Sequence, residues 1–178
     1  MNIANKLTLM RIVLVFVFMG LIWGPFALST NTMLWLALVI FIVASLTDFL
    51  DGYLARKLHL VTNLGKFMDP LADKMLVITA LVAIIDLGYK GMLPAGHLPA
   101  WIVVFIILRE LMVSGIRVLA ASQNVVLAAN YWGKVKTTVQ MITIIVYLLP
   151  ITVGFLPTCA IILAYASLAL TLISGFIT

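Results

Sequence analysis

Charged residues are scarce in this sequence: Lys, Arg, Asp and Glu together make up only 10% of its 178 residues, whereas hydrophobic residues make up 65%. A water-soluble domain needs far more polar side chains to cover its surface. The composition therefore excludes a soluble globular protein and predicts an integral membrane protein. It also argues against a nucleic-acid partner, although the net charge is +5.

Cysteine and histidine are almost absent as well. The chain has one cysteine, Cys159, and two histidines, His59 and His97. One cysteine cannot form a disulfide framework or a thiolate metal site, and the histidines have no partner at metal-ligand spacing. We therefore expect Cys159 to be a small core residue and both histidines to lie exposed in loops.

Long apolar stretches are what the sequence has in abundance. A membrane-spanning helix needs about 20 mostly apolar residues. Six such stretches lie near residues 12–28, 33–50, 72–88, 98–120, 135–151 and 155–177. Gly, Pro, Ser and Asn mark the short breaks between them, so we expect six antiparallel transmembrane helices in a single all-α domain over residues 1–178. The chain ends at Thr178 within an apolar stretch, which leaves open whether a C-terminal tail is missing.

The basic residues are distributed unequally between the two predicted membrane faces. Ten of eleven lie on the side of the N-terminus, and only Lys90 lies opposite. The positive-inside rule makes that side cytoplasmic, in a multi-pass protein of the cell membrane. The ten are Lys6, Arg11, Arg56, Lys57, Lys66, Lys74, Arg109, Arg117, Lys134 and Lys136.

Four aspartates lie on the same side, where ionised carboxylates near hydrocarbon need compensating partners. Asp48 and Asp51 are three residues apart at the end of the second predicted helix, and Asp69 and Asp73 are four apart at the start of the third. Each spacing puts its pair on one helix face. All-oxygen ligands favour Mg²⁺ or Mn²⁺, and four carboxylates are enough for two ions about 4 Å apart.

Two other interpretations of the aspartates stay open on spacing alone. They could form ion pairs with Arg56, Lys66 and Lys74, or line a cation or proton pathway of a transporter. No acidic or basic relay reaches the opposite face, which weakens the transport hypothesis. Gly52 and Gly65 allow a ligand to approach the backbone closely, and Arg56 suits a pyrophosphate. Pro70 fits the first turn of the third helix.

The segment between the aspartate pairs carries a specific resemblance. It reads D-x2-D-G-x2-A-R-x8-G-x3-D-x3-D, which resembles the signature of the CDP-alcohol phosphatidyltransferase family. The eight fixed positions are Asp48, Asp51, Gly52, Ala55, Arg56, Gly65, Asp69 and Asp73. The resemblance implies a fold of six transmembrane helices with a short N-terminal juxtamembrane helix, usually homodimeric.

The same resemblance implies an activity and a set of roles. All four aspartates would hold two divalent ions, with Asp73 also acting as general base. Asp48, Gly52, Ala55, Arg56 and Gly65 would bind the CDP-lipid. The patches NIANKLTLMR, LGKFMDPLADKMLV, RELMVSGIR and GKVKTTVQM are most similar to family members that transfer a phosphatidyl group from CDP-diacylglycerol to sn-glycerol 3-phosphate. Serine, inositol phosphate and phosphatidylglycerol are the alternative acceptors.

A phosphorylated acceptor requires a second basic cluster. The candidates are Arg109, Arg117, Lys134 and Lys136. Arg109 and Arg117 are eight residues apart, about 80° round an ideal helix, and can share a groove. Lys134 and Lys136 are two apart and take opposite faces, and Glu110 is expected to pair with a neighbouring helix.

Close to the N-terminus, three polar residues recur at three-residue spacing. They are Asn5, Thr8 and Arg11. The spacing gives one helix a polar stripe, which serves nucleotide contact or helix packing equally well. Asn5 and Thr8 are therefore kept as candidate contacts to the CDP-lipid.

Overall fold

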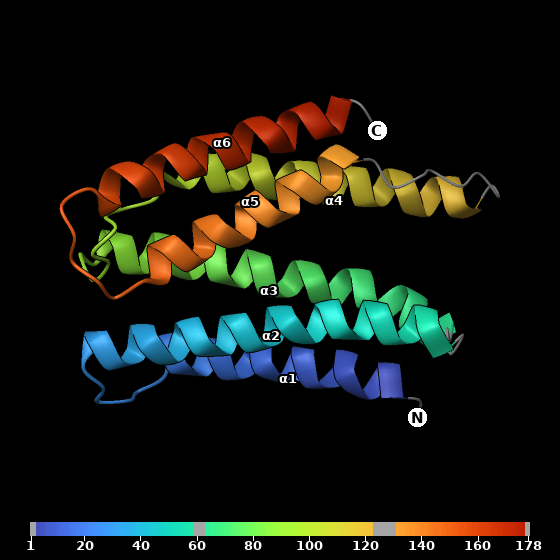
Figure 1. The fold of residues 1–178 in the computed structure, drawn as a ribbon, viewed down its shortest axis with the longest axis horizontal. Helices are drawn as coiled ribbons and strands as arrows, with labels where there is room; N and C mark the ends of the chain where they lie inside the picture. The colour runs from blue at the N-terminus through green and yellow to red at the C-terminus, as the bar shows by residue number, and fades with distance from the viewer. Residues whose placement is uncertain (1–2, 59–62, 123–130, 177–178) are drawn as a thin grey trace. The chain divides into compact units, whose positions relative to one another are not determined.

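The computed structural model describes residues 3–58, 63–122 and 131–176, and this part of the chain forms six α-helices and no strand (Figure 1). The all-helical prediction is therefore confirmed. The helices are α1 (Ile3–Trp23), α2 (Thr30–Leu58), α3 (Asn63–Tyr89), α4 (Ala100–Ser122), α5 (Tyr131–Leu148) and α6 (Leu156–Phe176).

The chain divides into two compact units. The first comprises Met1–Ala83 with Leu148–Pro150, and the second comprises Ile84–Tyr147 with Ile151–Thr178. The first unit therefore contains α1, α2 and most of α3, and the second contains the end of α3 together with α4, α5 and α6. A single catalytic domain over residues 1–178 stays a prediction.

In the first unit, α1 packs along α2 in the opposite direction (Figure 1). Buried residues recur every three or four positions along both helices, which places them on one face of each. Close packing of the apolar side chains among them stabilises the pair. They are Thr8, Arg11, Val15, Phe18 and Ile22 in α1, and Leu34, Ala37, Leu38, Phe41 and Ala44 in α2.

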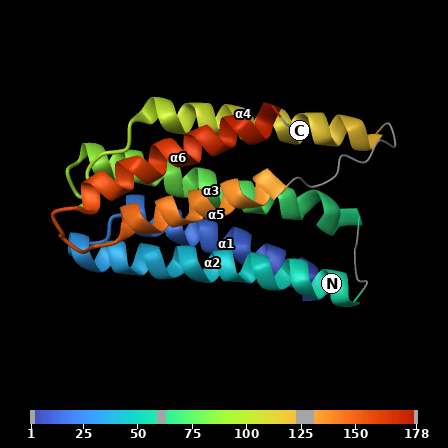
Figure 2. The ribbon, with the colours of Figure 1, turned by 45° about the horizontal axis from the view of Figure 1, so that its top comes forward.

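In the second unit, α4 packs against α6 (Figure 2). The rings of Trp101 and Tyr165 lie 6.0 Å apart across this pair. The small buried residues Ala160 and Ala164 allow α6 to approach its neighbours closely. From α5, the Thr143 hydroxyl donates to the Leu163 carbonyl of α6 at 3.3 Å, so both α4 and α5 contact α6.

Local signals explain where two of the helices begin and end. Ser29 precedes α2, and its Oγ accepts a hydrogen bond from the Thr32 backbone N–H at 3.2 Å, as an N-cap residue does. After α3, Gly91 adopts a φ of 66°. The Met92 N–H then donates to the Leu87 carbonyl at 2.9 Å and the Gly91 N–H to the Gly88 carbonyl at 3.0 Å, which is a Schellman motif.

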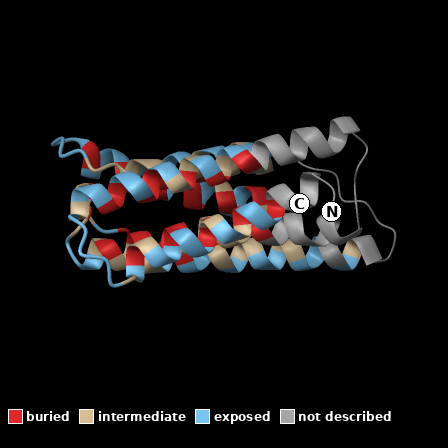
Figure 3. Cartoon of the chain, turned by 90° about the horizontal axis from the view of Figure 1, so that it is seen from below, coloured by how far each residue is buried: buried red, intermediate tan, exposed pale blue. Residues whose placement is uncertain are grey.

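Two stretches in the described residues are long and apolar enough to cross a bilayer. They are Thr30–Thr47 of α2 and Leu156–Gly175 of α6, while the apolar part of α1, Thr8–Trp23, is shorter. Buried and exposed residues alternate along the helices in stripes (Figure 3). Many exposed side chains are large and apolar, which suits contact with lipid; examples are Phe16, Trp35, Phe105, Met112 and Ile162. The count of six spans remains a prediction.

Three expectations about the helices are wrong. No separate juxtamembrane helix precedes the first long helix in the described residues, because α1 runs without a break from Ile3 to Trp23. The connection between the second and third helices, predicted near residues 51–71, is shorter than that, because α2 continues to Leu58 and α3 begins at Asn63. Pro70 consequently lies inside α3 and not in its first turn. Hydropathy marks the apolar part of a helix, whereas Ala, Leu, Arg and Lys extend the helix beyond it.

Cys159 also departs from expectation. It is exposed on α6 instead of buried in a core. A small, weakly polar thiol is tolerated on an apolar outer surface, so residence in an apolar stretch does not imply burial. His97 is exposed in the loop after α3, as predicted, with its ring 6.3 Å from that of Tyr89.

Candidate functional site

The aspartate motif extends over two helices of the first unit. Asp48 and Asp51 lie in α2, and Asp69 and Asp73 lie in α3, so each pair keeps its helical spacing. An i, i+3 or i, i+4 pair projects from one side of its helix. The backbone therefore agrees with the expectation that each pair shares a face. The side chains of residues 48–71 and of Asp73 lie outside the described residues.

The donor set itself fits hard divalent cations. Four carboxylates supply only oxygen ligands, which Mg²⁺ and Mn²⁺ prefer over the nitrogen and sulfur ligands that zinc and copper favour. Among the residues whose side chains are described, no other group of three or more metal-binding residues occurs. The remaining motif positions are also helical, Gly52, Ala55 and Arg56 in α2 and Gly65 in α3, with their surroundings outside the described residues.

The polar stripe on α1 points into the protein. Thr8 is buried, and Arg11 has an exposed fraction of 0%, which makes it the largest fully buried side chain in the described residues. A buried guanidinium is costly unless polar groups compensate it, so this face of α1 borders a polar interior and not lipid. Asn5 lies in α1, and its side chain is outside the described residues.

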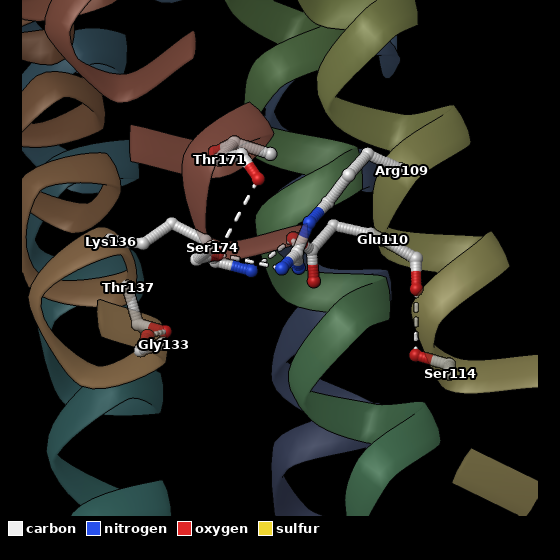
Figure 4. Close-up of polar contacts among 8 residues, drawn as sticks. All are labelled: Arg109, Glu110, Ser114, Gly133, Lys136, Thr137, Thr171 and Ser174. Atoms are coloured by element: carbon white, nitrogen blue, oxygen red, sulfur yellow. Dashed lines mark hydrogen bonds and ion pairs between the residues drawn. The ribbon is translucent and has the colours of Figure 1, made fainter. Parts of the chain in front are cut away.

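A cluster of charged residues joins the helices of the second unit (Figure 4). Glu110 of α4 accepts from the Arg109 guanidinium at 3.2 Å and forms an ion pair with Lys136 of α5. The side chains of Arg109, Glu110 and Lys136 are only 12%, 15% and 7% exposed. Low exposure strengthens the electrostatic interactions and raises the penalty for losing a partner. The expectation that Glu110 pairs with a neighbouring helix is confirmed.

Arg109 also reaches α6 (Figure 4). Its Nη2 donates to the Ser174 hydroxyl at 2.6 Å, and that hydroxyl donates to the Thr171 carbonyl at 3.4 Å. The next residue, Gly175, lies so close that a Cβ atom there would be 3.0 Å from Arg109 Nε. The guanidinium is therefore held between a carboxylate of its own helix and the backbone and hydroxyl of α6.

The structure brings together only part of the predicted basic cluster. Arg109 and Lys136 share Glu110, whereas Arg117 and Lys134 are exposed on α4 and α5. Lys134 and Lys136 take opposite faces of α5, as their spacing predicted. Arg109 is half-buried and Arg117 is exposed, and the expectation that both point to one groove stays a prediction.

Sequence reasoning missed the contribution of α6, which contains no charged residue. Its buried polar residues Ser167, Thr171 and Ser174 recur at spacings of four and three. That is the spacing of one helix face, and Lys136, Gln140 and Thr143 form a similar buried stripe on α5. Such a stripe of small polar residues in an apolar helix was the available signal.

Comparisons with known proteins agree with the motif. The sequence pattern of the CDP-alcohol phosphatidyltransferase family matches residues 1–173. The chain is 43% identical over 156 residues to the CDP-diacylglycerol–glycerol-3-phosphate 3-phosphatidyltransferase of Bacillus subtilis, covering 83% of this chain and 77% of that protein. It is 38% identical over 176 residues to the probable phosphatidylglycerophosphate synthase of Mycobacterium tuberculosis, covering 98% and 78%. It is 36% identical over 145 residues to the CDP-diacylglycerol–glycerol-3-phosphate 3-phosphatidyltransferase of Haemophilus influenzae, covering 80% of this chain and 73% of that protein.

Proposed function

Because the chain belongs to the CDP-alcohol phosphatidyltransferase family, a family of membrane enzymes, we propose that it transfers the phosphatidyl group of CDP-diacylglycerol to sn-glycerol 3-phosphate. The products are phosphatidylglycerophosphate and CMP. The observation that carries the proposal is the complete eight-position motif over α2 and α3, in a chain whose relatives are named for this reaction.

In the proposed reaction, an acceptor hydroxyl oxygen attacks the phosphorus that carries the diacylglycerol, and the bond from that phosphorus to the CMP oxygen breaks. Asp73 takes the hydroxyl proton, since the pKa of an alcohol lies far above neutral pH and its hydroxyl is almost wholly protonated there. Asp48, Asp51, Asp69 and Asp73 would hold two Mg²⁺ or Mn²⁺ ions, which supply charge neutralisation at the pyrophosphate and the departing CMP.

We assign the CDP-lipid to the motif positions that lie between the two aspartate pairs. The small residues Gly52, Ala55 and Gly65 would allow the lipid to approach the backbone, and Arg56 would be a bidentate cationic partner for a phosphate. Asn5 and Thr8 remain proposed nucleotide contacts. The burial of Thr8 and Arg11 supports this assignment, because it gives α1 a polar face inside the first unit.

The acceptor phosphate is assigned to the basic residues of the second unit. They are Arg109, Arg117, Lys134 and Lys136. A guanidinium offers five N–H donors, and the two bonds that Arg109 makes to Glu110 and Ser174 leave others for a phosphate. Exposed Arg117 and Lys134 would attract the anion electrostatically, while buried Lys136 contributes a charge close to Arg109.

We further propose a multi-pass topology in the cell membrane with the aspartates facing the cytoplasm, and a homodimer. The one-sided distribution of basic residues supports the orientation. The orientation can be measured with a Cys159→Ser chain that carries a single new cysteine at position 90 or 134. A membrane-impermeant maleimide added to intact cells should label position 90 and spare position 134. Mass photometry in nanodiscs measures the oligomeric state.

The catalytic proposal is tested by CMP release from labelled CDP-diacylglycerol by the purified protein. We expect release only with Mg²⁺ or Mn²⁺ and with glycerol 3-phosphate present. Asp69→Asn should abolish it, because the substitution removes a metal ligand without changing side-chain volume. Asp86→Asn is the matched control, since Asp86 lies outside the motif near the end of α3 and pairs with Lys90. Equal activity of the two variants, or turnover in a chelator, would contradict the proposal.

A further inference from the structure

Helix α6 fixes the orientation of a cation although it carries no charge itself. Of its residues, Ser174 accepts from Arg109 Nη2 at 2.6 Å, and its own proton is directed to the Thr171 carbonyl at 3.4 Å. Ser174 is buried, so no bulk water competes for these bonds. Hydrogen bonds to a charged group in such surroundings are among the strong ones, and this one restricts where the guanidinium lies.

Gly175 also affects the position of Arg109, because the arginine side chain lies close to where a Cβ atom of residue 175 would be. A Cβ atom at this position would lie 3.0 Å from Arg109 Nε, 3.4 Å from its Cγ and 3.8 Å from its Cδ. The 3.0 Å approach to Nε is tighter than an ordinary van der Waals contact, whereas the 3.8 Å approach to Cδ is not, so a residue with a Cβ atom would require the arginine to move by a few tenths of an ångström. In the part of the chain that the structure describes, no atom lies within 4 Å of the corresponding position at Gly115 of α4 or Gly133 of α5.

Glu110 couples this arrangement to α5. Its carboxylate contacts both Arg109 and Lys136, so the two cations of the proposed acceptor site share one anionic partner. Without that carboxylate, the two positive charges would repel each other at low exposure to solvent. The positions of Arg109 and Lys136 therefore depend on residues that need not touch a substrate.

We propose that Ser174 and Gly175, together with Glu110, are positioning residues that set the affinity of the enzyme for the acceptor phosphate. This inference rests on the proposed function, because it assumes that Arg109 and Lys136 bind that phosphate. A helix with no charge thus determines acceptor affinity through the placement of the Arg109 guanidinium. Misplacement of a binding group by about 1 Å can cost about 100-fold, so a displacement of a few tenths of an ångström should cost roughly 3- to 10-fold.

The experiment compares steady-state kinetics of the wild type, Gly175→Ala and Ser174→Ala in lipid nanodiscs, with each substrate varied in turn. We expect the KM for glycerol 3-phosphate to rise about 3- to 10-fold in both variants. The KM for CDP-diacylglycerol and the kcat should change less than about twofold, because the motif over α2 and α3 is untouched. Gly115→Ala, which adds the same methyl group to a helix where nothing is within 4 Å, should match the wild type.

Thermal unfolding of each variant separates positioning from loss of the fold. If Gly175→Ala does not fold, Ser174→Ala decides the question alone. An unchanged KM for glycerol 3-phosphate in folded variants, or equal changes for both substrates, overturns the positioning role while leaving the proposed function intact. A wild type that does not use glycerol 3-phosphate overturns the proposed function and this inference with it.

Discussion

The ion pair between Glu110 and Lys136 offers a quantitative test of the second unit. In Glu110→Gln the volume stays nearly the same, but Arg109 and Lys136 lose their shared negative partner. Removing one partner of a buried pair costs about 3–5 kcal/mol. For a chain of this size, each kcal/mol changes the Tm by about 2–4 °C, so the variant should melt about 6–20 °C lower.

The control for this change is the other carboxylate pair of the same unit. Asp86 and Lys90 form an ion pair four residues apart at the end of α3, and their side chains are 34% and 52% exposed. Exposed pairs contribute only about 0–1 kcal/mol, so Asp86→Asn should lower the Tm by less than about 4 °C.

Differential scanning fluorimetry in one detergent measures both variants. Adding Lys136→Met to Glu110→Gln should restore part of the lost stability, because the ammonium that has lost its Glu110 partner is then gone. If Glu110→Gln and Asp86→Asn melt within about 2 °C of each other, the low exposure of the Glu110 cluster does not carry the energy assigned to it.

Three further outcomes follow from particular contacts and from the metal assignment. Ser29→Ala removes the hydroxyl that accepts a hydrogen bond from the Thr32 N–H, and it should lower the stability by about 1 kcal/mol and the Tm by about 2–4 °C. An unchanged Tm would show that this N-cap does not stabilise the protein. Gly91→Ala forces a residue with a side chain into a φ of 66° and should destabilise the protein by about 1–2 kcal/mol. Gly20→Ala inside α1 should be neutral or stabilising, because no atom of the described residues lies within 4 Å of the added Cβ atom. A lower Tm for Gly20→Ala than for Gly91→Ala would contradict this. Chelation should abolish CMP release, and added Mg²⁺ or Mn²⁺ should restore it while Ca²⁺, with its larger and looser coordination, should not; restoration by Ca²⁺ alone would refute the assignment.

Much of the helical architecture could be predicted because apolar runs are long and Gly, Pro and Ser punctuate them. The breaks at Gly24 and Pro25 and at Gly88–Pro99 are both followed by the start of a helix in the structure. Helix ends were less predictable. Hydropathy falls where aspartates and basic residues begin, yet the backbone remains helical there, so α2 and α3 extend beyond the apolar stretches 33–50 and 72–88.

The candidate site, like the fold, could be predicted only in part from the sequence. The aspartate motif could be identified because its chemistry lies in the residue types and their spacing within one short segment. The partners of Arg109 and Glu110 could not be predicted, because Ser174 is 65 residues from Arg109 and Lys136 is 26 residues from Glu110 in the sequence. Their proximity results from the packing of α4, α5 and α6. Gly175 was still harder to anticipate, since its effect depends on a side chain that it does not have.

The identity of the lipid product tests the proposed reaction most directly. Purified protein in nanodiscs would receive CDP-diacylglycerol, Mg²⁺ and equal concentrations of glycerol 3-phosphate, serine, inositol phosphate and phosphatidylglycerol, and mass spectrometry would identify the products. We expect phosphatidylglycerophosphate as the dominant lipid, with one CMP released for each molecule formed and none formed by Asp69→Asn. A product derived from serine, inositol phosphate or phosphatidylglycerol in place of it would contradict the assigned acceptor.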